Sequence, residues 1–267
     1  MDYEINKYSC SSFDMNFLKF GKGERTLVII PGISIGSLLP TAKLITDSYK
    51  AVAEEFTVYL FERIENPPMS YSIHEMAEDT CTAITGLGLK DIYLFGASQG
   101  GMISLDLVLN HKELIQRVFL AASAAKVTPM ALDTVKTWIS FAEKKDGKGL
   151  MHSFGKKLYP KELYEASHKL LDDLGEKVSD NDFKKFVIMA NALKGYDLSD
   201  RLSEIKTGIL FAGAYDDNVL GPSAIELFKD AAKTNKSFEI YVLSGYGHAF
   251  YDTAPEIKSK MLEFFSS

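Results

Sequence analysis

The sequence has few cysteines, no long apolar run and no leader-like start. Its two cysteines, Cys10 and Cys81, lie in no metal-binding or redox spacing, and such scarcity is typical of a reducing compartment. No apolar run reaches the roughly 18 residues that a membrane span needs. The first residues lack the basic and apolar regions of a signal peptide. These absences predict a cytoplasmic protein without a membrane-spanning segment.

Blocks of basic residues and cofactor motifs are also missing. The chain carries 30 Lys and Arg against 36 Asp and Glu, a net charge of −6, and no run of five or six basic residues. Nucleic acids and anionic membranes are therefore poor partners. Residues 31–36 lack the G-x-G-x-x-G spacing, and no phosphate loop, His-Glu-x-x-His or paired Cys-x-x-Cys occurs. The sequence predicts no cofactor and no metal, and it leaves the oligomeric state open.

What the chain does have is an ordinary globular composition and a regular alternation of strand and helix patterns. Its 267 residues are 46% hydrophobic, enough for one large domain with an insertion. Residues 8–20 predict an edge strand or hairpin. Short apolar runs at 26–30, 56–61, 91–95, 117–122, 208–213 and 238–243 predict buried strands, separated by helical patterns. This order predicts an α/β fold with a mostly parallel, doubly wound sheet.

The alternation stops between residues 126 and 202, where only helical patterns occur. The apolar stripes there are Ala131, Val135, Trp138, Ile139 and Ala142, then Leu163, Leu170, Leu171 and Leu174, then Phe183, Phe186, Val187, Ala190 and Leu193. They predict a helical cap, residues 126–202, inserted into a core of residues 1–125 and 203–267. Because the cap is rich in Leu, Phe, Met and Ala, we expect a small-molecule substrate with an apolar part.

A Gly-x-Ser-x-Gly pattern stands at residues 96–100, between a predicted strand and a predicted helix. In a nucleophile elbow the serine occupies a strained strand-to-helix turn. The turn brings neighbouring backbone close to the chain, so Gly96 and Gly100 leave space that side chains would fill. The following helix directs its N-terminal N–H groups at the reaction centre. This pattern makes Ser98 the candidate nucleophile.

A serine hydroxyl needs a base, and the base needs an orienting group. Ser98, Asp216 and His248 occur in that order, each just after a predicted strand. The carboxyl ends of parallel strands meet at one edge of such a sheet, where ligands bind. The adjacent Asp217 is the alternative acid. A turn-forming aspartate and a plain loop histidine are the structural alternatives for these two positions.

On these motifs the chain resembles the α/β-hydrolase-fold family, in its serine, carboxylesterase-like branch with a helical cap. The resemblance runs from Leu27 to the last helix. It implies Ser98 as nucleophile, His248 as general base and Asp216, in the Gly-x-x-Asp pattern after a strand, as the orienting acid. It also implies an oxyanion hole formed by the backbone N–H groups of Gln99 and Ile33.

Many members of that family carry His-Gly where this chain has Pro31-Gly32, which leaves Ser34 as the alternative second donor. A serine at the elbow disfavours the haloalkane and epoxide branches, which use aspartate. The implied activity is hydrolysis of a carboxylic ester or related acyl compound. Cleavage of a C–C bond, a thioester or a small peptide, or a receptor role that retains the triad, are the alternatives.

Overall fold

The computed structural model describes residues 1–267 and contains one eight-stranded sheet. The strands are β1 (Tyr3–Ser9), β2 (Asp14–Phe20), β3 (Arg25–Ile30), β4 (Phe56–Ile64), β5 (Ile92–Ala97), β6 (Ile115–Ala121), β7 (Gly208–Ala214) and β8 (Phe238–Leu243). Their order in the sheet is β1-β2-β4-β3-β5-β6-β7-β8. The β1–β2 and β2–β4 pairs are antiparallel and all other pairs are parallel. The predicted α/β fold is confirmed.

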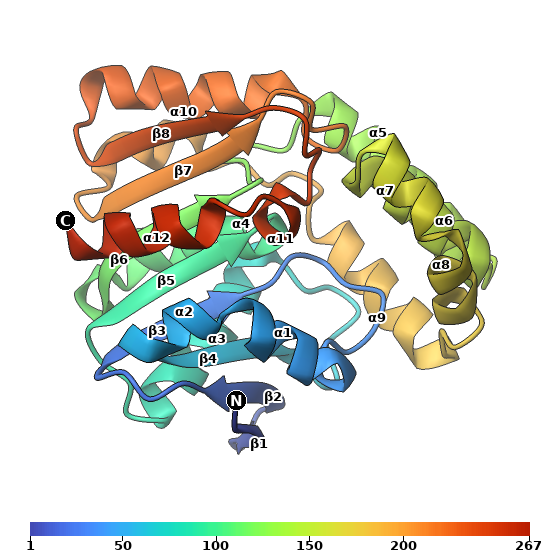
Figure 1. Ribbon diagram of the computed structural model, residues 1–267, viewed down its shortest axis with the longest axis horizontal. Helices are drawn as coiled ribbons and strands as arrows, with labels where there is room; N and C mark the ends of the chain where they lie inside the picture. The colour runs from blue at the N-terminus through green and yellow to red at the C-terminus, as the bar shows by residue number, and fades with distance from the viewer.

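Helices cover both faces of this sheet (Figure 1). One face packs against α1 (Ala42–Ser48), α2 (Lys50–Glu55) and α12 (Ile257–Ser266), and the other against α3 (Ile73–Gly86), α4 (Gln99–Asn110) and α10 (Pro222–Thr234). Within β3, Leu27 and Ile29 point into the first layer, whereas Val28 and Ile30 point into the second. Burial on both faces explains why the central strands are continuously apolar in sequence.

The helical segment between β3 and β4 is divided in the structure. It consists of η1 (Leu39–Thr41), α1 and α2, with a break at Tyr49. The last helix is α12, preceded by the short α11 (Phe250–Thr253). A short η2 (Lys112–Leu114) follows α4. None of the helices has both the length and the apolar character needed to cross a lipid bilayer.

Between β6 and β7 the chain is helical. It forms α5 (Pro129–Glu143), α6 (Gly147–Leu158), α7 (Lys161–Ala166), α8 (His168–Gly175), α9 (Asp180–Asn191) and η3 (Ser199–Glu204). Helices α5–α9 lie on the side to which the arrowheads of β5, β7 and β8 point (Figure 1). The cap helices are thus placed at the edge of the sheet where the strands end.

Two of the three apolar stripes of the cap pack as predicted. All five stripe residues of α5 are buried, and so are Phe183, Phe186, Ala190 and Leu193 of the third stripe. The prediction that the four leucines share one helical face was wrong. Leu163 lies on α7 and the other three lie on α8, where Leu171 is buried; Leu163, Leu170 and Leu174 are exposed.

Candidate active site

Ser98 connects β5 to α4 in a backbone conformation that non-glycine residues rarely adopt, with φ 51° and ψ −119°. The flanking glycines are required by close backbone contacts. A Cβ on Gly100 would overlap the Ile30 carbonyl oxygen and lie 2.6 Å from the Pro31 oxygen. A Cβ on Gly96 would collide with the Ser104 hydroxyl and lie 2.7 Å from the Gly100 oxygen. The strain at Ser98 is therefore held in place by backbone packed directly behind it.

His248 lies in the loop after β8 and contacts both Ser98 and a carboxylate. Its Nε2 is 3.0 Å from Ser98 Oγ, and its Nδ1 is 2.7 Å from Asp217 Oδ2. The imidazole is 2% exposed and Asp217 is 6% exposed. Three residues far apart in sequence thus form one continuous hydrogen-bonded chain, with Ser98 at its accessible end.

The sequence predicts Asp216 as the acid that contacts His248, but in the structure Asp217 makes this contact. Both carboxylate oxygens of Asp216 are engaged elsewhere, accepting hydrogen bonds from the N–H groups of Gly245 at 3.0 Å and Gly247 at 2.9 Å. Asp217 Oδ1 accepts from Val219 N at 2.8 Å and Leu220 N at 2.9 Å, which turns Oδ2 toward His248. Asp217 therefore orients the imidazole, and Asp216 fixes the loop that carries it.

The environment of Asp217 keeps its carboxylate ionised. Burial alone would raise the pKa of Asp217, but the positive charge and hydrogen bond of His248, together with the N–H groups of Leu220 and Val219, outweigh it. The pKa of Asp217 is consequently lowered from its ordinary value. An ionised acid at this position accepts a hydrogen bond from His248 Nδ1, which leaves Nε2 facing Ser98.

The turn after β3 lies against Ser98. A Cβ on Gly32 would be 3.1 Å from Ser98 Cβ and 3.7 Å from Ser98 Oγ. The next backbone N–H, that of Ile33, donates to no protein acceptor. Gln99 is the first residue of α4, so its N–H has no acceptor within the helix. Of the two expected oxyanion donors, Gln99 therefore directly follows Ser98, and Ile33 follows the glycine that lies beside it.

Arg63, near the end of β4, belongs to the site but to none of the sequence motifs. Its Nη2 donates to the Pro31 carbonyl at 2.9 Å and lies 3.4 Å from Gln99 Oε1, while its Nε is buried without a partner. Burial lowers the pKa of Arg63 to about 10, against the raising effects of Tyr71 and Glu62. The guanidinium thus supports the Pro31-Gly32 turn. Like Ser98, Arg63 lies at the carboxyl end of a strand, and this position is the sequence feature that could have identified it.

A cavity of about 320 Å³ adjoins this turn. Its lining is mainly polar and includes Arg63 and Gln99 from the core and Asn181 and Lys185 from α9. The Gln99 amide also donates to the Met189 carbonyl of α9 at 2.7 Å, which ties the elbow to the cap. A substrate reaching this cavity would meet polar groups, whereas the sequence suggested a substrate with an apolar part.

The cap also contacts the loops that carry the acid and the base. The Thr128 hydroxyl donates to the Leu220 carbonyl at 2.8 Å, next to the turn that positions Asp217. The Ala249 N–H, directly after His248, donates to the Leu158 carbonyl of α6 at 3.0 Å. Residues of the segment 126–202 are therefore hydrogen-bonded to both loops that carry Asp217 and His248.

A parallel sheet with a nucleophile elbow, and a histidine and carboxylate at the carboxyl ends of later strands, define an α/β hydrolase. The chain belongs to the family with the alpha/beta hydrolase fold, because the model of that family matches residues 26–255. It is 27% identical over 192 residues to a protein of Caulobacter segnis named carbamate hydrolase RutD, with 71% of each chain covered.

Two solved structures show the same fold. The α/β hydrolase MGS-M2 from a Medee basin deep-sea metagenome library has a TM-score of 0.86 at 18% identity, with 98% of each chain covered. The enol-lactonase of Burkholderia xenovorans LB400 has a TM-score of 0.79 at 18% identity, covering 98% of this chain and 100% of its own. The chain is therefore a hydrolase-family protein by sequence and by fold.

Proposed function

We propose that this protein is a serine hydrolase that cleaves a carboxylic ester or a related acyl compound through an acyl-enzyme. The observation that carries the proposal is the hydrogen-bonded chain from Ser98 through His248 to Asp217. In this assignment Ser98 is the nucleophile, His248 the general base and Asp217 the residue that orients it. Asp217 thus takes the role that the sequence predicted for Asp216.

In the proposed reaction, Ser98 Oγ attacks the acyl carbon while His248 Nε2 takes its proton. The bond to the leaving alcohol or amine then breaks, and that group receives the proton from His248. A water molecule, deprotonated by His248, attacks the acyl-enzyme and releases the acid, with the proton returning to Ser98. All protons pass through one imidazole, whose position Asp217 and the Asp216-bound loop hold.

We assign the oxyanion hole to the backbone N–H groups of Ile33 and Gln99. The position of Gly32 beside Ser98 supports Ile33, the next residue, over Ser34, which is one residue further along the turn. Each donor of this kind is worth about 10² to 10³ in turnover. We further propose that residues 126–202 act as the cap that selects the substrate.

One triad can cleave several types of acyl bond. Esters, lactones and carbamates all place an acyl carbon in front of Ser98, and the names of the similar proteins include carbamate hydrolase and enol-lactonase. The polar cavity beside Arg63 and Lys185 favours a substrate with a polar group next to its acyl part. A substrate screen should therefore contain short esters, lactones and carbamates.

The Ser98→Ala variant tests the proposal. We expect it to lower kcat for short p-nitrophenyl esters by roughly 10⁴-fold or more, because the acyl-enzyme cannot form. It should also abolish labelling by a fluorophosphonate. The exposed Ser48 offers a matched control, since Ser48→Ala should keep both activity and labelling. Turnover that survives Ser98→Ala contradicts the mechanism, and a wild-type protein that neither labels nor turns over any acyl compound would favour the receptor alternative.

Arg63→Met tests the support of the oxyanion turn. We expect kcat to fall about 10-fold to 100-fold with little change in KM, because the Pro31-Gly32 turn loses its donor while the substrate contacts stay. Arg63→Lys should recover part of kcat, since a single ammonium can still donate to the Pro31 carbonyl. A rise in KM at unchanged kcat would show instead that Arg63 binds substrate.

A further inference from the structure

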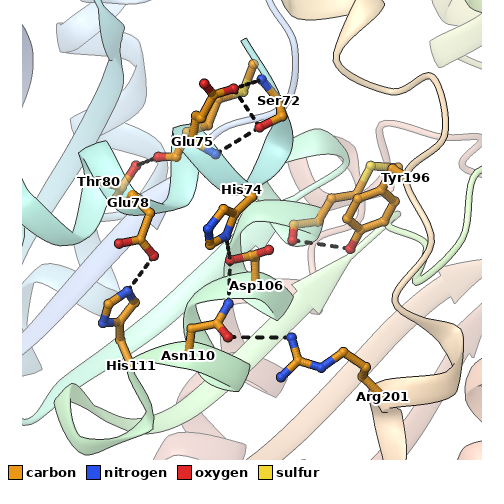
Figure 2. Close-up of polar contacts among 12 residues, drawn as sticks. Ser72, His74, Glu75, Glu78, Thr80, Asp106, Asn110, His111, Tyr196 and Arg201 are labelled. Carbon is orange, nitrogen blue, oxygen red and sulfur yellow. Dashed lines mark hydrogen bonds and ion pairs between the residues drawn. The ribbon is translucent and has the colours of Figure 1, made fainter.

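A cluster of metal-binding residue types lies between α3 and α4, outside the active site. His74 and Glu78 are one helical turn apart on α3, and Asp106 faces them from α4 (Figure 2). One ligand atom from each of the three residues lies within 4.8 Å of the others. Two helices separated in sequence by strand β5 thus bring an imidazole and two carboxylates to one point.

Asp106 is the fixed member of the cluster. Its side chain is 7% exposed, and its Oδ1 accepts from His74 Nδ1 at 2.9 Å and from Asn110 Nδ2 at 2.8 Å. Its Oδ2 accepts no hydrogen bond from the protein, so a lone pair on a buried carboxylate is available to a ligand. A carboxylate that is buried and held by a neighbouring amide is a pre-positioned ligand.

Glu78 is held in a similar way. His111, just after α4, lies with Nε2 2.7 Å from Glu78 Oε1 (Figure 2). The carboxylates of the cluster therefore each have a second group that orients them, Asn110 for Asp106 and His111 for Glu78. Metal-binding carboxylates commonly have such outer partners.

The distances suit a small transition-metal ion after minor side-chain movement. Ligand atoms around tetrahedral Zn²⁺, each about 2.0–2.1 Å from the ion, are roughly 3.3 Å apart. The groups of the cluster lie within 4.8 Å, and the His74 and Glu78 side chains are 60% and 45% exposed, so both can rotate toward Asp106. An imidazole with carboxylates is a donor set for Zn²⁺, whereas Mg²⁺ and Ca²⁺ require oxygen ligands.

The charges around the cluster do not oppose a cation. Glu75 follows His74 on α3, and its carboxylate accepts hydrogen bonds from Ser72 (Figure 2). Arg201, drawn in the same view, is paired with Glu204 at 3.0 Å and donates to the Asn110 amide oxygen at 3.5 Å. A divalent ion would take the place of the hydrogen bond between His74 and Asp106, and the positive charge of Arg201 is already paired with Glu204.

We propose that His74, Glu78 and Asp106 form a Zn²⁺ site that joins α3 to α4. Asn110 and His111 orient the two carboxylates. The site is independent of the proposed hydrolase activity, because it contains none of the residues of the Ser98–His248–Asp217 chain. Its expected effect is to stabilise the native fold, since an ion that binds only the folded protein raises the free energy of unfolding.

Calorimetric titration of chelator-treated protein with ZnCl₂ at neutral pH tests the site. We expect one Zn²⁺ per chain with micromolar affinity, an increase in Tm, and binding at least about 100-fold weaker for Mg²⁺ and Ca²⁺. His74→Ala and Asp106→Asn should each remove the binding and the Tm increase, while leaving ester turnover unchanged. Co²⁺ in place of Zn²⁺ should show the visible absorption of a His-ligated ion in the wild type and in neither of these two variants.

Two control variants separate this site from others. His248→Ala removes the active-site imidazole and His168→Ala removes one on the cap, so both should bind Zn²⁺ as wild type does. Loss of binding in His248→Ala together with its retention in His74→Ala would overturn the proposal and place the ion at the triad. Retention in all four variants would mean adventitious surface binding, and no heat or Tm change with Zn²⁺ would also overturn it.

Discussion

Asp217→Asn is expected to lower kcat/KM for acyl substrates by roughly 10⁴-fold, whereas Asp216→Asn should lower it by about tenfold or less. An asparagine at 217 keeps the shape of the side chain but replaces a charged acceptor with an amide. Its NH₂ group can donate to His248 Nδ1, and its oxygen is only a weak acceptor, so the tautomer with the proton on Nδ1 is no longer favoured. The 2.7 Å contact between Asp217 Oδ2 and His248 Nδ1 carries this expectation. Steady-state kinetics on the two variants, with the wild type in the same assay, measure the contrast.

The smaller effect at Asp216 has a different cause. An asparagine there retains one oxygen for Gly245 or Gly247 but cannot accept from both N–H groups. The His248 loop should loosen, so the melting temperature should fall together with a modest loss of kcat. The reverse ranking, with Asp216→Asn the more damaging to kcat at unchanged stability, would return the role of orienting acid to Asp216.

Gly100→Ala is expected to destabilise the fold by about 3 kcal/mol and to remove most of the activity. The added Cβ would overlap the Ile30 carbonyl oxygen and lie close to the Pro31 oxygen. Both oxygens belong to the backbone, so no side-chain rotamer change can move them away. The elbow must therefore shift away from β3, and a displacement of about 1 Å at the nucleophile costs about 10² in rate. Chemical unfolding and fluorophosphonate labelling measure the two effects.

Gly208→Ala is the matched control for that substitution. Gly208 begins β7, and a Cβ there would meet Arg117 and Phe264 side-chain atoms at ordinary distances of 3.9 Å. Its stability should stay within about 0.5 kcal/mol of wild type. If Gly100→Ala behaves like Gly208→Ala in stability and labelling, the tight packing of the elbow against β3 is not required. Loss of soluble protein for Gly100→Ala alone counts as the expected destabilisation.

The local part of this protein could be predicted from sequence because it depends on short-range chemistry. A strand buried on both faces must be continuously apolar, so β3, β5, β6 and β7 were visible as runs of hydrophobic residues. Ser98 was visible because the strained turn needs glycine on both sides. The order of strands and helices then predicted the sheet, since parallel neighbours require helical crossovers.

Choices between near-equivalent neighbours were decided only by the tertiary structure. Asp216 and Asp217 are adjacent and chemically identical, and which one faces His248 depends on the N–H groups of Gly245, Gly247, Val219 and Leu220, which come from two loops. The spacing rule selected Asp216 because it counts residues and contains no information about where loop N–H groups point.

The same reason applies to Arg63, to the exposed leucines of the cap and to the cluster of His74, Glu78 and Asp106. Each depends on contacts between segments that sequence separates: β4 with the Pro31 turn, α7 with α8, and α3 with α4. By itself the sequence determined the class of fold and singled out Ser98 and His248 as candidates for nucleophile and base, because each of these has a local steric or chemical requirement. The acid, its supports and the side chains that meet between elements follow from packing, which only the folded chain defines.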